Sequence, residues 1–396
     1  MTKILDKRAT TTVWRLSAIT ALVLAFTGHA MAAPEADGGV ADLQQLATGK
    51  VVGLGGAAVP IARPGVDAAT VVNELLKPPL SAEAALRIAL LNNPGLQVSL
   101  ASAGVSLSDT VRAGSPAKLK AQQYLTLLSA QARRAWIEAV AAAQSARYLL
   151  DAQEASQAAG ELARRMTQVG NMSKLQQARE QALLSEATVQ LARAQQAAFN
   201  AREKLIVTLG LWGEQTRFEL PSQLPELPPQ AQDLPDVESR VLRERLDLRL
   251  AQAQWQRQLA GPRPTSADGL WDALRDSAKV RELAVKTRSE ARQVYNNYRT
   301  AYDVARHYQG EVVPLRKFIN DEVVLRYNGM LLNVFDLLAD TRAQVLSVNS
   351  AIEAQRDFWL AEADLQTLLA GAPVELSSGA SSASSSGAAA GAAAAH

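Results

Sequence analysis

The sequence predicts an all-α protein that contains two similar antiparallel hairpins of long helices and little or no β-sheet. Three observations support this prediction. Long spans lack proline and nearly lack glycine, apolar residues in the last of them recur with a period of 3.5, and the second half of the chain repeats the first. Of the 396 residues, 48% are hydrophobic but only 5% are aromatic. Small alanine residues supply much of the apolar fraction, and alanine is the best helix former.

Residues 1–32 are predicted to be a secretory signal peptide. Lys3, Lys7 and Arg8 precede an apolar run over 16–26, and Ala30-Met31-Ala32 fits a cleavage site. The apolar run is shorter than the roughly 20 residues that a membrane span needs. The chain is therefore expected to be exported.

Residues 33–79 are rich in Gly, Ala and Pro, and we expect an extended leader there. A glycine-rich run over 51–58 is similar to a dinucleotide-binding loop. Such a loop must lead directly into a helix, and Pro60 and Pro64 would break that helix. The sequence therefore predicts no nucleotide cofactor.

The first helical repeat is predicted over 80–212. Ser81 can cap a short helix, which Asn92-Asn93-Pro94-Gly95 interrupts. Long helices are expected at about 118–169 and 171–210. Gly170-Asn171 between them forms a helix stop and a turn. A proline-rich linker over 213–235 ends this repeat.

The second helical repeat is predicted over 236–371. A helix to residue 260 is broken by Gly261-Pro262-Arg263-Pro264, and long helices are expected at about 270–327 and 330–369. In the last helix, residues at alternating three- and four-residue steps predict a buried seam: Val334, Leu338, Val345, Val348, Ile352 and Trp359. The tail 372–396 is nearly all Ser, Gly and Ala, and we expect it to be disordered.

The two repeats align without gaps at an offset of 159 residues, which overlays 129–209 on 288–368. Gly170 then meets Gly329, and Phe199 meets Phe358. The short helices before each hairpin correspond at an offset of 152. Because glycine at a helix end often adopts positive φ, we expect Gly329 to do so.

Composition argues against several classes of function. The 41 Lys and Arg nearly balance 39 Asp and Glu, so no basic excess indicates nucleic acid, and there is no Cys. Only His307 of the three histidines could serve acid–base or metal chemistry, and packing is its expected role. Glu362 and Asp364 should lie on different helix faces and form no acid–base pair. We therefore expect no enzyme, cofactor or metal site.

The order of several motifs resembles that of the TolC-type outer-membrane efflux proteins, over about residues 80–371. These motifs are Leu80-Ser81-Ala82-Glu83-Ala84-Ala85-Leu86, Asn92-Asn93-Pro94, Ala163-Arg164-Arg165-Met166 before Gly170-Asn171, Tyr327-Asn328-Gly329 and Asp336-Leu337-Leu338. The resemblance implies a homotrimer whose helices form an α-barrel tunnel across the periplasm. It also implies an outer-membrane location, a periplasmic adaptor protein and an inner-membrane efflux pump as partners.

The sequence departs from that family at two joints, about Ala113 to Ala117 and Gly261 to Gly269. In the family, each joint holds two membrane strands of a β-barrel, and neither joint here is long enough for them. We therefore expect both strand hairpins to be missing and the residues present to lie in the periplasm. The alternative is a soluble periplasmic helical protein that binds partners and conducts nothing.

The resemblance also implies candidate site residues. Asp336 and Asp340 lie four residues apart, on one helix face, and would line the pore entrance. An ordinary solvated helix face is the equal alternative. The turns at Gly170, Asn171, Tyr327, Asn328 and Gly329 would meet the adaptor, although every helical hairpin needs such turns.

Overall fold

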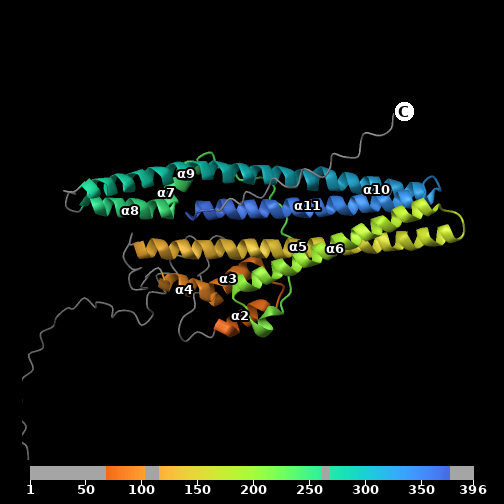
Figure 1. Cartoon of the computed structure of the whole chain (residues 1–396), viewed down its shortest axis with the longest axis horizontal. Coiled ribbons are helices and arrows are strands. Elements are labelled where there is room, and N and C mark those ends of the chain that lie inside the picture. Colours follow the sequence, from red (N-terminus) through yellow and green to blue (C-terminus); the bar gives the residue numbers. More distant parts are fainter. Residues whose placement is uncertain (1–67, 103–115, 261–266, 375–396) are drawn as a thin grey trace, which may run out of the picture. The chain divides into compact units, whose positions relative to one another are not determined.

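The computed structural model describes residues 68–102, 116–260 and 267–374, all within one compact unit. The predicted signal peptide, most of the leader, the tail from residue 375 and most of both joints lie outside these described residues. The described residues contain helices and no strand, which confirms the all-α prediction (Figure 1). No helix among them is long and apolar enough to cross a membrane.

The first half of the described chain contains five α-helices and a short 3₁₀ turn. They are α2 (Ala68–Leu76), α3 (Ala82–Asn92), α4 (Pro94–Ser102), α5 (Pro116–Gln168), α6 (Lys174–Leu209) and η2 (Gly213–Thr216). The expectation of an extended leader was wrong for residues 68–76. Val72 is fully buried in the core, and this contact supports a short helix that the weak sequence pattern did not indicate.

The second half repeats this arrangement with one long helix divided in three. Its elements are α7 (Val237–Glu244), α8 (Leu246–Ala260), α9 (Ala267–His307), the π-helical turn η3 (Tyr308–Val312), α10 (Val313–Asn328) and α11 (Val334–Leu369). The four predicted long helices are confirmed, as α5, α6, α9 to α10 and α11. In packing order, α6 lies against α5, α5 against α11, and α11 against α9 and α10.

The π-helical turn explains why the two halves are not related by a single offset. Pro314 has no backbone N–H, and its ring would clash with the carbonyl of Gly310 in an ideal helix. Val313 instead donates to the carbonyl of Tyr308, five residues back. This turn accommodates one extra residue. The helix ends at the turn, Gln168 and Asn328, are accordingly 160 residues apart rather than the predicted 159.

The short helices obey the predicted offset of 152. Asn93 ends α3, and Arg245, 152 residues later, ends α7. Each of these helix ends is tied to the long helices of its own hairpin. The Asn93 side chain donates to the Thr208 carbonyl at 2.7 Å. Arg245 pairs with Glu290 of α9, while Leu246 N donates to the Gly371 carbonyl at 2.9 Å.

Two glycines close these contacts because no side chain fits there. Gly210 has φ +68°, and a Cβ on it would lie 2.6 Å from the Asn92 carbonyl oxygen. Gly371 has φ +95°, and a Cβ there would lie 2.2 Å from the Glu244 carbonyl oxygen. Both the left-handed backbone and the close approach therefore require glycine.

Each half has its own hydrophobic core. In the first, Trp136 of α5 is buried beside α3 and donates its indole N–H to the Leu80 carbonyl at 2.6 Å. In the second, Phe358 is fully buried against the rings of Tyr298, Tyr302 and Trp359. Phe199 and Phe358, which the repeat alignment paired, do not have equivalent environments, because Phe199 is 58% exposed.

The proline-rich linker lies along α9. The Gln232 amide donates to the Tyr298 hydroxyl at 2.9 Å, and the Tyr302 hydroxyl donates to the Pro228 carbonyl at 3.0 Å. Tyrosine hydroxyls thus satisfy backbone groups that an extended segment leaves open.

Burial decreases sharply beyond the π-helical turn. No described residue from 306 to 351 is buried, and α10 contains no buried residue. Of the predicted seam in α11, only Ile352 is buried, and the other members are half-buried. The prediction of a continuous buried seam was therefore wrong over residues 334–348, where α11 packs mainly on the exposed α10.

Candidate functional site

The turn between α5 and α6 has the geometry that its sequence predicts. Gly170 has φ +80°, and the Asn171 amide donates back to the Met166 carbonyl at 2.8 Å. Ser173 and Gln176 form a reciprocal capping box at the start of α6. A Cβ on Gly170 would meet nothing within 4 Å. A side chain at position 170 would therefore meet no clash, and only the left-handed backbone conformation requires glycine there.

The turn between α10 and α11 differs from the prediction. Gly329 has φ −78°, so the expected positive φ was wrong. The left-handed residue is Met330, with φ 58°, and Leu331 N donates back to the Arg326 carbonyl at 2.9 Å. Met330 therefore takes the place of Gly170, because the extra residue of the π-helical turn shifts the register by one.

Exposed apolar side chains gather beside both turns. Around Gly170 and Asn171, Val169 is 70% exposed and Leu175 63%. In the second turn, Met330 is 93% exposed and Leu331 76%, next to Tyr327. Sequence reasoning identified the glycines, Asn171, Tyr327 and Asn328 but missed these apolar residues. Their apolar character at turn positions, which are usually polar, was the signal that could have identified them.

The two candidate entrance carboxylates lie in successive turns of α11, but in different surroundings. Asp336 is exposed in the first turn, where its backbone N–H donates to the Asn333 side chain at 2.9 Å. Asp340 is half-buried, and its Oδ2 is buried without a hydrogen bond from any described residue. The structure thus presents Asp336 to solvent, whereas Asp340 is partly enclosed by the protein.

An ion pair near these aspartates connects the two hairpins. Arg342 Nη2 of α11 lies 2.7 Å from Glu180 Oε2 of α6, and both side chains are less than one-fifth exposed. Between the hairpins, α5 and α11 carry two further pairs. Arg133 Nη2 lies 2.7 Å from Glu362 Oε2, and Arg134 pairs with Asp364. Burial raises the pKa of Glu362 and of Asp364, and the paired arginines offset part of that rise.

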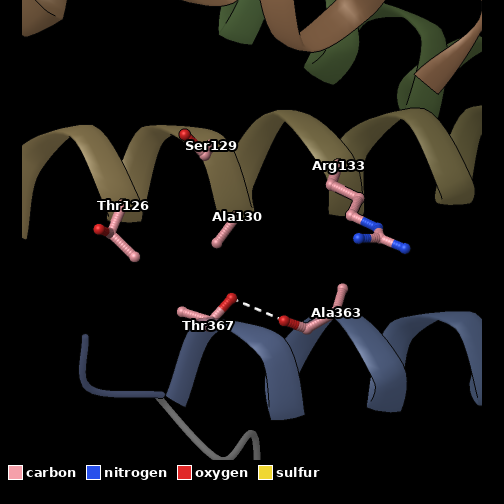
Figure 2. Close-up of a pocket in the computed structure, with 6 residues that line it drawn as sticks. All are labelled: Thr126, Ser129, Ala130, Arg133, Ala363 and Thr367. Atoms are coloured by element: carbon pink, nitrogen blue, oxygen red, sulfur yellow. Dashed lines mark hydrogen bonds between the residues drawn. The ribbon is translucent and has the colours of Figure 1, made fainter. Parts of the chain in front are cut away.

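A small cavity of about 10 Å³ lies beside Arg133, between α5 and α11 (Figure 2). The hydroxyls of Thr126, Ser129 and Thr367 line it, and each donates to a carbonyl one turn back in its own helix. Such a cavity has about the space that one water molecule needs. It is too small for a substrate.

His307 is the histidine that the sequence left as a candidate for acid–base or metal chemistry. His307 is exposed and lies 3.2 Å from Glu311, so the expected packing role was wrong. Among the described residues, no group of His, Asp and Glu side chains could hold a metal ion.

Comparison with known proteins gives a likeness in structure alone. No protein-family model matches the sequence, and no curated protein does. The outer-membrane channel OprN superposes with a TM-score of 0.53 at 16% identity, over 71% of this chain and 72% of OprN. The Campylobacter jejuni outer-membrane channel CmeC gives 0.52 at 12% identity, over 77% of this chain and 86% of CmeC. CusC, described for transmembrane channel formation, gives a TM-score of 0.51 at 14% identity, over 77% of this chain and 95% of CusC.

The chain has the fold of TolC-type outer-membrane channels. This confirms the predicted resemblance at the level of the fold. The TolC-type likeness covers most of this chain. The low sequence identity explains why loose motifs in a fixed order carried the signal when whole-sequence similarity did not.

Proposed function

We propose that this chain forms the periplasmic tunnel of a TolC-like outer-membrane efflux channel and acts as a passive conduit. The observation that supports this most directly is the channel fold, over 71–77% of the chain. The chain catalyses no reaction in this proposal. Its partners are two further copies of itself, a periplasmic adaptor protein and an inner-membrane efflux pump.

The packing order of the helices supports assembly into a closed ring. In the order α6, α5, α11 and α9 to α10, the first and last members have neighbours on one side. Both of these edge helices expose large apolar side chains: Val189, Phe199 and Val207 on α6, and Val304, Leu315, Phe318 and Leu325 on α9 to α10. Two unlike edges that join head to tail produce a ring when the rotation closes.

The turns and Asp336 have specific roles in this assembly. The apolar side chains beside Gly170 and Met330 would contact the adaptor, because both turns lie at hairpin ends. Three copies of the exposed Asp336 would form an anionic ring at the tunnel entrance, which favours cations over anions. Asp340 would contribute less, because it is half-buried within its own chain.

Cysteine cross-linking tests the ring cleanly, because the chain contains no Cys. A variant with Val189→Cys on α6 and Leu315→Cys on α10 should form disulfides between copies under mild oxidation. The expected products are covalent species of up to three chains, and each single-cysteine variant should stop at two. The native mass of the unmodified protein should be that of three chains. A monomer that still binds an adaptor would favour the alternative, a periplasmic partner-binding protein that conducts nothing.

A further inference from the structure

The end of the second hairpin opposite the α10–α11 turn carries an unusual surface. Three large apolar side chains lie there, close to the joint between α8 and α9. Leu259 in the last turn of α8 is 62% exposed, and Trp271 and Leu274 near the start of α9 are 68% and 56% exposed. Trp271 and Leu274 are three residues apart and so share one face of the helix. Figure 1 shows α8 and the start of α9 side by side at this end.

The same region concentrates positive charge. Residues 248–288 contain eight Lys and Arg against four Asp and Glu, a net charge of +4 in a chain whose total is +2. Seven of the cationic side chains are exposed: Arg249, Arg257, Arg275, Lys279, Arg281, Lys286 and Arg288. Among the described anions of this region, Asp272 and Asp276 are half-buried and Glu282 is exposed. Asp272 is also paired with Arg275 at 2.7 Å. The surface therefore presents mainly cations.

We propose that this surface, formed by Leu259, Trp271, Leu274 and the exposed cations of α8 and of the first half of α9, binds the surface of an anionic lipid bilayer. An exposed Trp with neighbouring Leu residues and flanking Lys and Arg is the composition of helices that lie in the lipid interface. The indole ring has an apolar body and a polar N–H, so it is stable at the headgroup level. Each cation near an anionic membrane adds attraction.

A bilayer fits this surface better than the same surface of a second copy of the chain. Two copies of the same surface would bring like charges together, which opposes their contact. A bilayer supplies both an apolar layer for Trp271 and anionic headgroups for Lys279 and Arg281. The inference does not rest on the proposed tunnel function, because a monomer could bind lipid through this surface equally well.

Vesicle binding by the exported, purified protein tests the inference. The vesicles contain phosphatidylcholine alone or with 30% phosphatidylglycerol. Binding is expected with the anionic vesicles only and should weaken as salt is raised. Trp271→Ser with Leu274→Ser should weaken binding at least tenfold. Lys279→Gln with Arg281→Gln should weaken it about fivefold for each removed cation.

Matched controls come from exposed residues elsewhere in the chain. Trp212 is 78% exposed, and Trp212→Ser should leave vesicle binding unchanged. Arg179 and Arg193 are exposed on α6, and Arg179→Gln with Arg193→Gln should have at most a small effect. All variants keep the same N-terminus, so any contribution from the N-terminus cancels. Helix content by circular dichroism verifies that each variant is folded.

A second measurement does not depend on destabilising substitutions. Brominated lipids in the vesicles should quench part of the tryptophan fluorescence, and Trp271→Phe should remove that part while binding persists. Equal binding to neutral vesicles, or full retention by the Trp271→Ser, Leu274→Ser variant, would overturn the inference. It would also be overturned if inorganic phosphate at millimolar concentration abolished binding, or if that variant lost its oligomeric mass but kept its lipid binding.

Discussion

Arg342 of α11 and Glu180 of α6 form an ion pair between the two hairpins, with 2.7 Å between Nη2 and Oε2. Both helices also contact α5. The contact between α6 and α5 is the more extensive, and the contact between α11 and α5 joins the two halves. No described residue from 306 to 351 is buried, so this pair, with both side chains less than one-fifth exposed, is a contact that can hold the turn end of the second hairpin to the first.

Removing one partner of this pair should therefore destabilise the protein. Glu180→Gln leaves a half-buried guanidinium without its counter-ion, and we expect a loss of about 1–3 kcal/mol in the free energy of unfolding. Urea denaturation measures this loss. Glu161→Gln, which disrupts exposed pairs with Arg164 and Arg165, is the control and should change the stability little. Equal effects of the two substitutions would contradict a role for Arg342 and Glu180 in joining the hairpins.

The two turns should differ in their tolerance of alanine. Gly170→Ala places a Cβ at φ +80° and should cost about 1 kcal/mol, whereas Gly329→Ala at φ −78° should cost nothing. Met330→Gly should raise the melting temperature, because it relieves a left-handed methionine. Thermal unfolding of the three variants measures these effects. A larger loss for Gly329→Ala than for Gly170→Ala would show that the register shift at the π-helical turn is wrong.

The buried Arg245 should be the most sensitive ionic position among the described residues. Its side chain is 2% exposed and pairs with Asp247 and with Glu290, which also accepts a hydrogen bond from the Val374 amide at 2.8 Å. Glu290→Ala leaves a charge buried with one partner fewer and should cost about 3 kcal/mol. Arg292→Ala, two residues along the same helix and exposed, should cost less than 1 kcal/mol in the same denaturation experiment.

The free energy of unfolding should depend on pH through the interface between α5 and α11. Burial raises the pKa of Glu362 and Asp364, so the folded state binds their protons more tightly than the unfolded state does. The stability that this tighter proton binding contributes is fully present below the unfolded pKa values, near 4. It is lost as pH rises through the raised pKa values of the folded state. The change in stability caused by Glu362→Gln with Asp364→Asn should therefore be more favourable at pH 7 than at pH 4. Denaturation at both pH values measures the difference, and an equal effect at both would contradict it.

Local signals in the sequence determined the long helices, the positions of the turns and the duplication. Long spans without proline predict helices because backbone hydrogen bonding within a helix is local. Ser81, Ser173 and Gly170 mark helix ends because caps act over three or four residues. The order of loose motifs was sufficient to predict the channel fold, although overall identity to the solved channels is low.

Only the tertiary structure decided features that depend on contacts distant in the sequence. Pro314 predicts a local disturbance, but how the helix absorbs an extra residue depends on its packing, so Met330 rather than Gly329 became the left-handed residue. The pairing of Arg133 with Glu362 joins residues more than 200 positions apart, and no local pattern predicts it. Asp336 is likewise more exposed than Asp340, and Phe199 is more exposed than Phe358. Burial depends on which neighbours the whole fold brings to each helix face.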